Sequence, residues 1–191
     1  MSESIDLIEL QKRQHDHDRE HHQDIFNTSY PDRMNHYVLH FSKYVGRLSE
    51  QNSNDQEVTK HLEKTLADSF IVALAAANTL NLDIHQQIQA RHGIDGKTTK
   101  LLAEELNHLD KMDSTKEVRG WLFTNLAVPA GEMANAMESL DHMEPMAVRQ
   151  VLEEETMNIV EDLLIASDLI SVDLGSLLEE RWNEIEEESI L

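Results

Sequence analysis

The hydrophobic residues of this chain are spaced as they are in helices that bury one face. Over residues 31–49 they recur at steps of three and four, which places them on a single side of a helix. The members of this stripe are Met34, Tyr37, Val38, Phe41, Tyr44, Val45 and Leu48. Pro31 stands at its start, where proline is well tolerated in a first helical turn. The pattern predicts an amphipathic helix packed on a core.

A more apolar helix is expected next. Asn54, followed three residues later by Glu57, is typical of a capping pair at a helix start. The helix is predicted to run to about Leu80. Residues 69–77 are apolar nearly all round, which favours a central position with neighbours on several sides.

Short helices and their caps divide the chain into parts. Asp83 is predicted to cap a short helix that ends near Gly93, and Asp173 to cap the last helix. A linking helix is expected over about 98–112. The polar N-terminal segment, residues 1–30, is expected to be helical, to fray and to be solvated.

A second set of helices follows residue 113. Ser114 and Glu117 form another capping pair, and Pro129 is expected to kink or split the helix that they begin. Pro145 restarts the chain, and a long helix is predicted to end at about Ile170. The apolar face of the first of these helices consists of Val118, Trp121, Leu122, Leu126, Met133, Met137 and Leu140.

The two sets of helices follow one pattern. At an offset of 90, Asp68 falls on Asn158, Leu74 on Leu164, Ala76 on Ala166, Asn78 on Asp168, Asp83 on Asp173, and Arg91 on Arg181. In the preceding helices the offset is 85, which places Gly46 on Gly131 and Glu50 on Asn135. The sequence therefore predicts an all-α helical bundle of two tandem units, 31–97 and 114–191, joined by 98–113. The alternative is that any two amphipathic helix pairs can be made to match.

Composition narrows the function classes. Only 6 Gly and 3 Pro occur in 191 residues, aromatic residues make up 5 %, and cysteine is absent, which fits helices and a reducing compartment. No apolar run reaches the length of a membrane span, so a cytoplasmic protein without a membrane partner is expected. The net charge of -21 would repel nucleic acid, so an anionic ligand would need a bound cation. Solubility or adaptation to a salty cytoplasm could also account for the charge.

Oxygen side chains recur at a three-residue step in the second unit. Glu132 and Asn135 share one helix face, and Glu155 and Asn158 share a face of the next helix. Carboxylates that converge from neighbouring helices form the hard-oxygen cluster that Mg²⁺ prefers. Alternatively, these glutamates are solvated helix formers.

The chain resembles the MazG-type all-α nucleoside triphosphate pyrophosphohydrolases. The text that carries the resemblance is AGEMANAMES and EETMNIVEDLLIASDLISVDLGSLLEERW, and, in the first unit, YVGRLSEQ and TLADSFIVALAAANTLNLDIHQQIQAR. The resemblance implies a helical bundle that uses Mg²⁺ to convert a nucleoside triphosphate to a monophosphate and pyrophosphate.

The four acidic positions of that family are incomplete in both units. They read Arg47, Glu50, Thr65 and Asp68 in the first unit, and Glu132, Asn135, Glu155 and Asn158 in the second. The resemblance implies Mg²⁺ ligands among Glu132, Glu155, Asn158, Glu50 and Asp68, with Glu132 and Glu155 as the catalytic pair. Either the two units build one composite site, or both sites have decayed.

A basic stripe distinguishes the first unit. His36, His40, Lys43 and Arg47 follow one another at steps of four, three and four on one helix. His40, Lys43 and Arg47 are predicted to bind a triphosphate, with Arg47 replacing a metal by direct contact with phosphate. The alternative is a solvated face paired with nearby acidic residues.

Two histidine pairs are further metal candidates. His17 and His21 could hold a transition metal, although a solvated terminus is the simpler interpretation. Glu105 and His108 match one half of a di-iron motif whose second half is absent from the sequence.

Two functions are therefore predicted. The first is Mg²⁺-dependent hydrolysis of a nucleoside triphosphate. The second is a non-catalytic helical protein that acts as a nucleotide sensor or an assembly partner. The sequence leaves a homodimer open.

Overall fold

The computed structural model describes residues 5–50, 55–110 and 118–189, and in that part of the chain the regular structure is helical, as predicted. The helices are α1 (Leu7–His21), α2 (Gln23–Phe26), α3 (Tyr30–Ser49), α4 (Asp55–Leu80), α5 (Ile84–His92), α6 (Thr99–Asp110), α7 (Val118–Asp141), α8 (Val148–Leu169) and α9 (Leu174–Ser189). Two isolated residues, Asp6 and Thr98, form a single antiparallel bridge.

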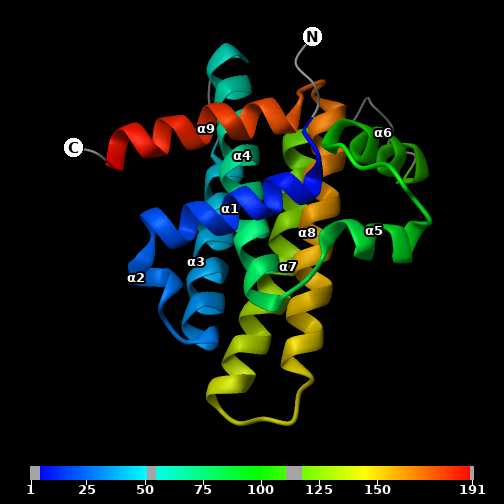
Figure 1. The fold of residues 1–191 in the computed structure, drawn as a ribbon. Coiled ribbons are helices and arrows are strands. Elements are labelled where there is room, and N and C mark those ends of the chain that lie inside the picture. The colour runs from blue at the N-terminus through cyan, green and yellow to red at the C-terminus, as the bar shows by residue number, and fades with distance from the viewer. Residues whose placement is uncertain (1–4, 51–54, 111–117, 190–191) are drawn as a thin grey trace.

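Four long helices make the central bundle. The pairs in contact are α3 with α4, α4 with α8, α8 with α7, and α7 with α3, which closes a ring of four. Figure 1 shows these helices running along one direction, with α1 and α9 crossing them and α5 and α6 at one side. Because two neighbours flank each long helix, each needs a broad apolar face.

Helix α4 has the broadest apolar face, as its composition predicted. Phe70, Leu74 and Ala77 are completely inaccessible to solvent, and Ser69 is also buried. The buried side chains of the bundle form one continuous core, which extends to α1 and α9 through Leu10 and Trp182.

The caps at Asp83 and Asp173 are confirmed. Asp83 Oδ1 accepts a hydrogen bond from the Gln86 amide at 3.0 Å, and Asp173 Oδ1 accepts one from the Ser176 amide at 2.8 Å. Gly93 ends α5 with φ of 73°, a conformation that glycine adopts without a steric cost. The other two predicted cap residues, Asn54 and Ser114, lie outside the described residues.

The turns before these caps share one geometry. Asn81 and Ser171 have φ of 55° and 58°, and both follow the end of a long helix. The Leu82 amide donates to the Ala77 carbonyl, and the Val172 amide donates to the Ser167 carbonyl, each at 2.9 Å. Each residue of the second turn stands 90 positions after its counterpart in the first turn. The offset found in the sequence therefore extends to the backbone.

The N-terminal segment is not a solvated terminus, and the prediction for residues 1–30 is corrected in this respect. Leu7 and Leu10 are fully buried, and Gln14 is 1 % exposed. Trp182 Nε1 of α9 donates to Gln14 Oε1 at 2.8 Å. The polar run concealed this because α1 buries polar residues together with apolar ones.

Pro129 does not split its helix. The structure has α7 as one helix from Val118 to Asp141, with Pro129 inside it. Leu126, Ala130 and Met133, on either side of the proline, are buried in the core. Packing against both α3 and α8 offsets the roughly 3 kcal/mol that an internal proline costs a helix.

None of the described helices is, by itself, long and apolar enough to cross a membrane. The bent pair formed by Thr59–Leu80 and Ile84–His92 passes that test jointly, by length and composition only.

Candidate functional site

A cavity of about 390 Å³ opens where α1, α2 and α9 meet α3 and α4. Its cationic wall is formed by Lys43 and Arg47 of α3 and Arg181 of α9. Its apolar wall comes from Phe26 of α2 and from Ile71, Val72 and Ala75 of α4. A volume of this size is within the range of small-molecule sites.

Asp68 organises the cationic wall. Arg47 Nη1 donates to Asp68 Oδ2, and Arg181 Nε donates to Asp68 Oδ1, both at 2.6 Å. The Asp68 side chain is only 7 % exposed, so these charge-assisted bonds hold it in a buried position. Both carboxylate oxygens are used, and a metal at Asp68 would have to displace a guanidinium group.

The basic stripe predicted on α3 lies along this cavity. Lys43 Nζ and Tyr44 Oη lie 3.2 and 3.0 Å from the same atom, His40 Nδ1. An ammonium group only donates, so Nδ1 accepts and the proton of the neutral ring is on Nε2. Lys43 Nζ also lies 4.8 Å from the centre of the Tyr44 ring. Among the residues that the structure describes, Arg47 is the one member of the stripe that forms an ion pair with a carboxylate, that of Asp68, so the solvated-face alternative describes the stripe in part.

The pKa shifts around the stripe show a positive local environment. The pKa of His40 is lowered to about 4, chiefly by burial and in part by the nearby Lys43 and His36. Burial and the positive charge of Arg47 also lower the pKa of Lys43. Burial raises the pKa of the Tyr44 hydroxyl, with a further contribution from Asp68. An anion in the cavity would relieve the repulsion among these cations.

Asp18 of α1 also lines the cavity and is partly uncharged near neutral pH. Burial raises its pKa from 3.8 to about 7, although Gln14 Nε2 donates to Asp18 Oδ1 at 2.7 Å and opposes the rise. A carboxyl group in this state can either donate or accept a hydrogen bond. The lining therefore includes a cationic wall and a carboxyl group that can bind a polar neutral group.

The shift at Asp18 predicts a pH effect on stability. The folded chain holds a proton on Asp18 between pH 3.8 and about 7, and the unfolded chain does not, so this contribution to stability is present at low pH and is lost as the pH rises. From pH 4 to pH 8 the free energy of unfolding of the unaltered chain should therefore fall relative to that of Asp18→Asn, by about 1 to 3 kcal/mol. Urea unfolding at both pH values measures the change.

Asp16→Asn is the control for Asp18→Asn. The hydrogen bond from Lys12 lowers the pKa of the exposed Asp16, so its substitution should change stability in the opposite direction. An equal response of the two variants would contradict the assignment to Asp18.

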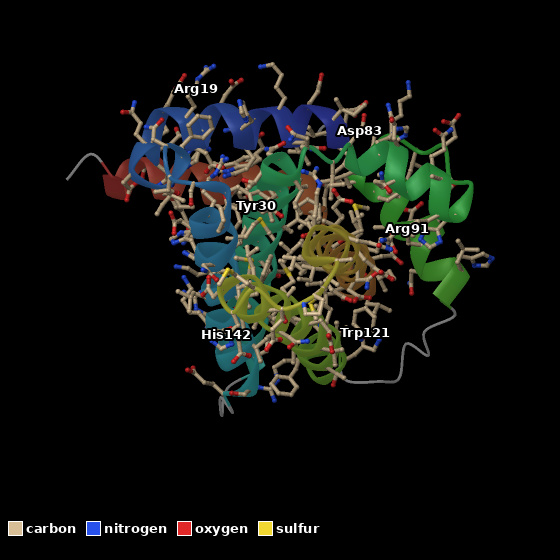
Figure 2. The ribbon with its side chains drawn as sticks, turned by 90° about the horizontal axis from the view of Figure 1, so that it is seen from below. Arg19, Tyr30, Asp83, Arg91, Trp121 and His142 are labelled. Carbon is tan, nitrogen blue, oxygen red and sulfur yellow. The ribbon has the colours of Figure 1, made fainter. Side chains whose placement is uncertain are left out.

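The other predicted metal ligands lie elsewhere. Glu132 and Glu50 are exposed, and the Glu50 carbonyl accepts a hydrogen bond from Arg119. Glu155 accepts from Asn158 Nδ2 at 3.0 Å, and Asn158 Oδ1 accepts from Arg91 Nη1 of α5 at 3.0 Å. Figure 2 shows Arg91 at the end of α5, on the side of the bundle away from α3.

The composite carboxylate site is not formed, and this prediction is corrected. Within the described parts of the chain, the residues that could hold a metal through three side chains are His17, His21 and Glu186, not the carboxylates predicted from the resemblance. Asp68 belongs to the face covered by α9, whereas Asn158 belongs to the face covered by α5. The two units therefore present their carboxylates on different faces.

Each of the two faces nevertheless has an arginine contact of the same kind. Arg181 of α9 binds Asp68 of α4, and Arg91 of α5 binds Asn158 of α8. Arg91 and Arg181 stand 90 positions apart in the sequence, and so do Asp68 and Asn158. Each arginine reaches across to a long helix of the other half of the chain.

Arg181, Tyr44 and Asp18 were missed as site residues. The alignment of Arg91 with Arg181 at an offset of 90 was the available signal for Arg181, but it does not show which acidic residue the arginine meets. Tyr44 was assigned to the apolar stripe, and Asp18 to a solvated segment. Burial of these polar groups depends on packing between helices that are distant in sequence.

The fold and the cavity define an all-α helical-bundle protein with a cavity that has a cationic wall. No protein-family model matches the chain, and comparisons with curated proteins and with solved structures find no significant match. The resemblance to the MazG-type enzymes stays a prediction from short motifs.

Proposed function

We propose that this protein binds a nucleoside triphosphate in the α3–α4–α9 cavity and does not hydrolyse it. The observation that carries the proposal is the cationic wall, in which Arg47 and Arg181 share one carboxylate and Lys43 adds a third positive charge. Among the described residues, Lys43 has no carboxylate within ion-pair distance. A triphosphate would supply the missing negative charge.

The remainder of the cavity suits the nucleoside part of such a ligand. Phe26, Ile71 and Val72 offer an apolar surface on which a base can lie. Asp18, which also lines the cavity, offers a hydrogen-bonding group. A mostly apolar pocket with a few convergent polar groups is typical of small-molecule sites.

The residues predicted to hold Mg²⁺ do not fit that metal. Magnesium needs near-octahedral oxygen ligands, and at most a few of them come from the protein. Glu132 is exposed, and the amide of Asn158 is bound both to Glu155 and to the cationic Arg91. A guanidinium group at this position opposes a divalent cation. Hydrolysis is therefore the second proposal, and the experiment below separates it from binding alone.

The test is calorimetric titration of the purified chain with ATP, GTP and their deoxy forms, in Mg²⁺ and in EDTA, together with a pyrophosphate assay. Binding should occur in EDTA, and pyrophosphate should not accumulate. Absence of binding to all of these nucleotides would overturn the proposal. Release of pyrophosphate that requires Mg²⁺ would establish hydrolysis instead.

Glu132→Gln and Glu155→Gln are expected to leave triphosphate affinity unchanged within about twofold, because neither residue lines the cavity. An interaction made only in a transition state would instead affect turnover by about a hundredfold or more. The same titration and pyrophosphate assay measure both quantities. Loss of binding in either variant would place the ligand on α7 and α8.

A further inference from the structure

Helices α1 and α9 lie side by side and run in the same direction (Figure 1). Successive contacts join Arg13 to Glu179, Gln14 to Trp182, and His17 to Glu186. The last turn of α1 is thereby brought against the second half of α9. His17 and His21 are four residues apart, so they share the face of α1 at this point.

Three potential metal ligands converge there. One ligand atom from each of His17, His21 and Glu186 lies within 4.8 Å of the other two. His17 Nδ1 is 3.4 Å from Glu186 Oε1, and the ring centres of His17 and His21 are 4.8 Å apart. Adjustments of side-chain torsions would bring these atoms to the spacing that a tetrahedral ion requires.

The imidazole of His17 is incompletely bonded. The His17 side chain is 4 % exposed, and its Nε2 is buried without a hydrogen-bond partner. A buried ring nitrogen that lacks a partner costs free energy.

We propose that His17, His21 and Glu186 bind a divalent transition-metal ion of the zinc type, which joins α1 to α9. Two imidazole nitrogens and one carboxylate oxygen are a donor set that suits Zn²⁺. Mg²⁺ and Ca²⁺ prefer oxygen ligands only, so this set does not suit them. Three protein ligands leave a fourth position. His22, whose ring centre lies 5.3 Å from that of His17, is placed to take it, as is water. The proposal does not depend on the nucleotide.

The test is titration of the full chain with Zn²⁺ and, for its visible absorption, with Co²⁺. Both ions should bind with a stoichiometry of one at the high-affinity site. Glu186→Gln and His21→Gln should each weaken binding by about tenfold or more, since even the partners of metal ligands contribute that much. Zn²⁺ should raise the melting temperature of the unaltered chain more than that of these variants.

Matched controls come from neighbouring residues. Glu187→Gln changes the next residue of α9, and His15→Gln changes an exposed histidine of α1. Both should keep the affinity of the unaltered chain. Equal affinity in Glu186→Gln and Glu187→Gln, or no binding of either metal at micromolar concentration, would overturn the proposal. Because circular dichroism reports folding separately, and Glu186 and His21 are not in the core, a loss of metal affinity is distinguishable from unfolding.

Discussion

Replacing Lys43 by glutamine is expected to weaken triphosphate binding by about 10- to 100-fold, the value of one hydrogen bond to a charged group. Lys43 lines the cavity, and Asp68 is already engaged by Arg47 and Arg181. The amide keeps most of the side-chain volume but removes the charge. Calorimetric titration with ATP measures the loss, which should diminish as salt is added, because ions screen the attraction.

Lys100→Gln is the control for this prediction. Lys100 is an exposed residue of α6, far in the fold from the cavity wall, and its removal changes the net charge by the same amount. It should leave the affinity within about twofold. If both variants lose affinity equally, the attraction comes from the overall charge, and the assignment of the cavity is contradicted.

Replacing Trp182 by alanine is expected to lower the free energy of unfolding by about 3 to 5 kcal/mol. The Trp182 side chain is completely buried, its Nε1 donates to the buried Gln14 Oε1, and the Arg13 guanidinium lies 4.6 Å from the ring centre. The substitution leaves a cavity and also deprives Gln14 of a hydrogen-bond partner. Urea unfolding followed by circular dichroism measures the loss.

Trp121→Ala provides the comparison, because Trp121 is only partly buried and packs on the edge of the core. Its effect should be smaller than half that of Trp182→Ala. Similar losses in both variants would show that α9 contributes less to the core than its packing indicates. Since Arg181 adjoins Trp182, the Trp182 variant should also bind triphosphate more weakly.

Most of the fold followed from local rules in the sequence. The spacing of apolar residues predicted α3, α4, α7 and α8, and the capping residues Asp83 and Asp173 gave the starts of α5 and α9. These features depend on residues three or four positions apart, so one sequence is enough to find them. The role of α1 depends on Gln14 and Trp182, which are far apart in the chain, and no local pattern joins them.

The candidate site was predicted in part for the same reason. His40, Lys43 and Arg47 share a face of one helix, so their proximity follows from helical geometry. The partner of Arg47 is Asp68, and that of Asp68 is Arg181, a contact across 113 positions. The composite carboxylate set assumed that equivalent positions of two units meet at one point. Helix packing placed them on different faces.

The two crossing arginines also bear on how the molecule unfolds. Arg91 and Arg181 each tie one half of the chain to the other, much as contacts tie the subunits of a two-chain assembly. Here the halves are covalently connected, so their association is intramolecular and does not depend on protein concentration. A fragment that contained one half alone would lose one of these contacts: Asp68 would keep Arg47 but lose Arg181, and Asn158 would lose Arg91. The molecule should therefore melt in a single step, at a temperature that dilution does not change.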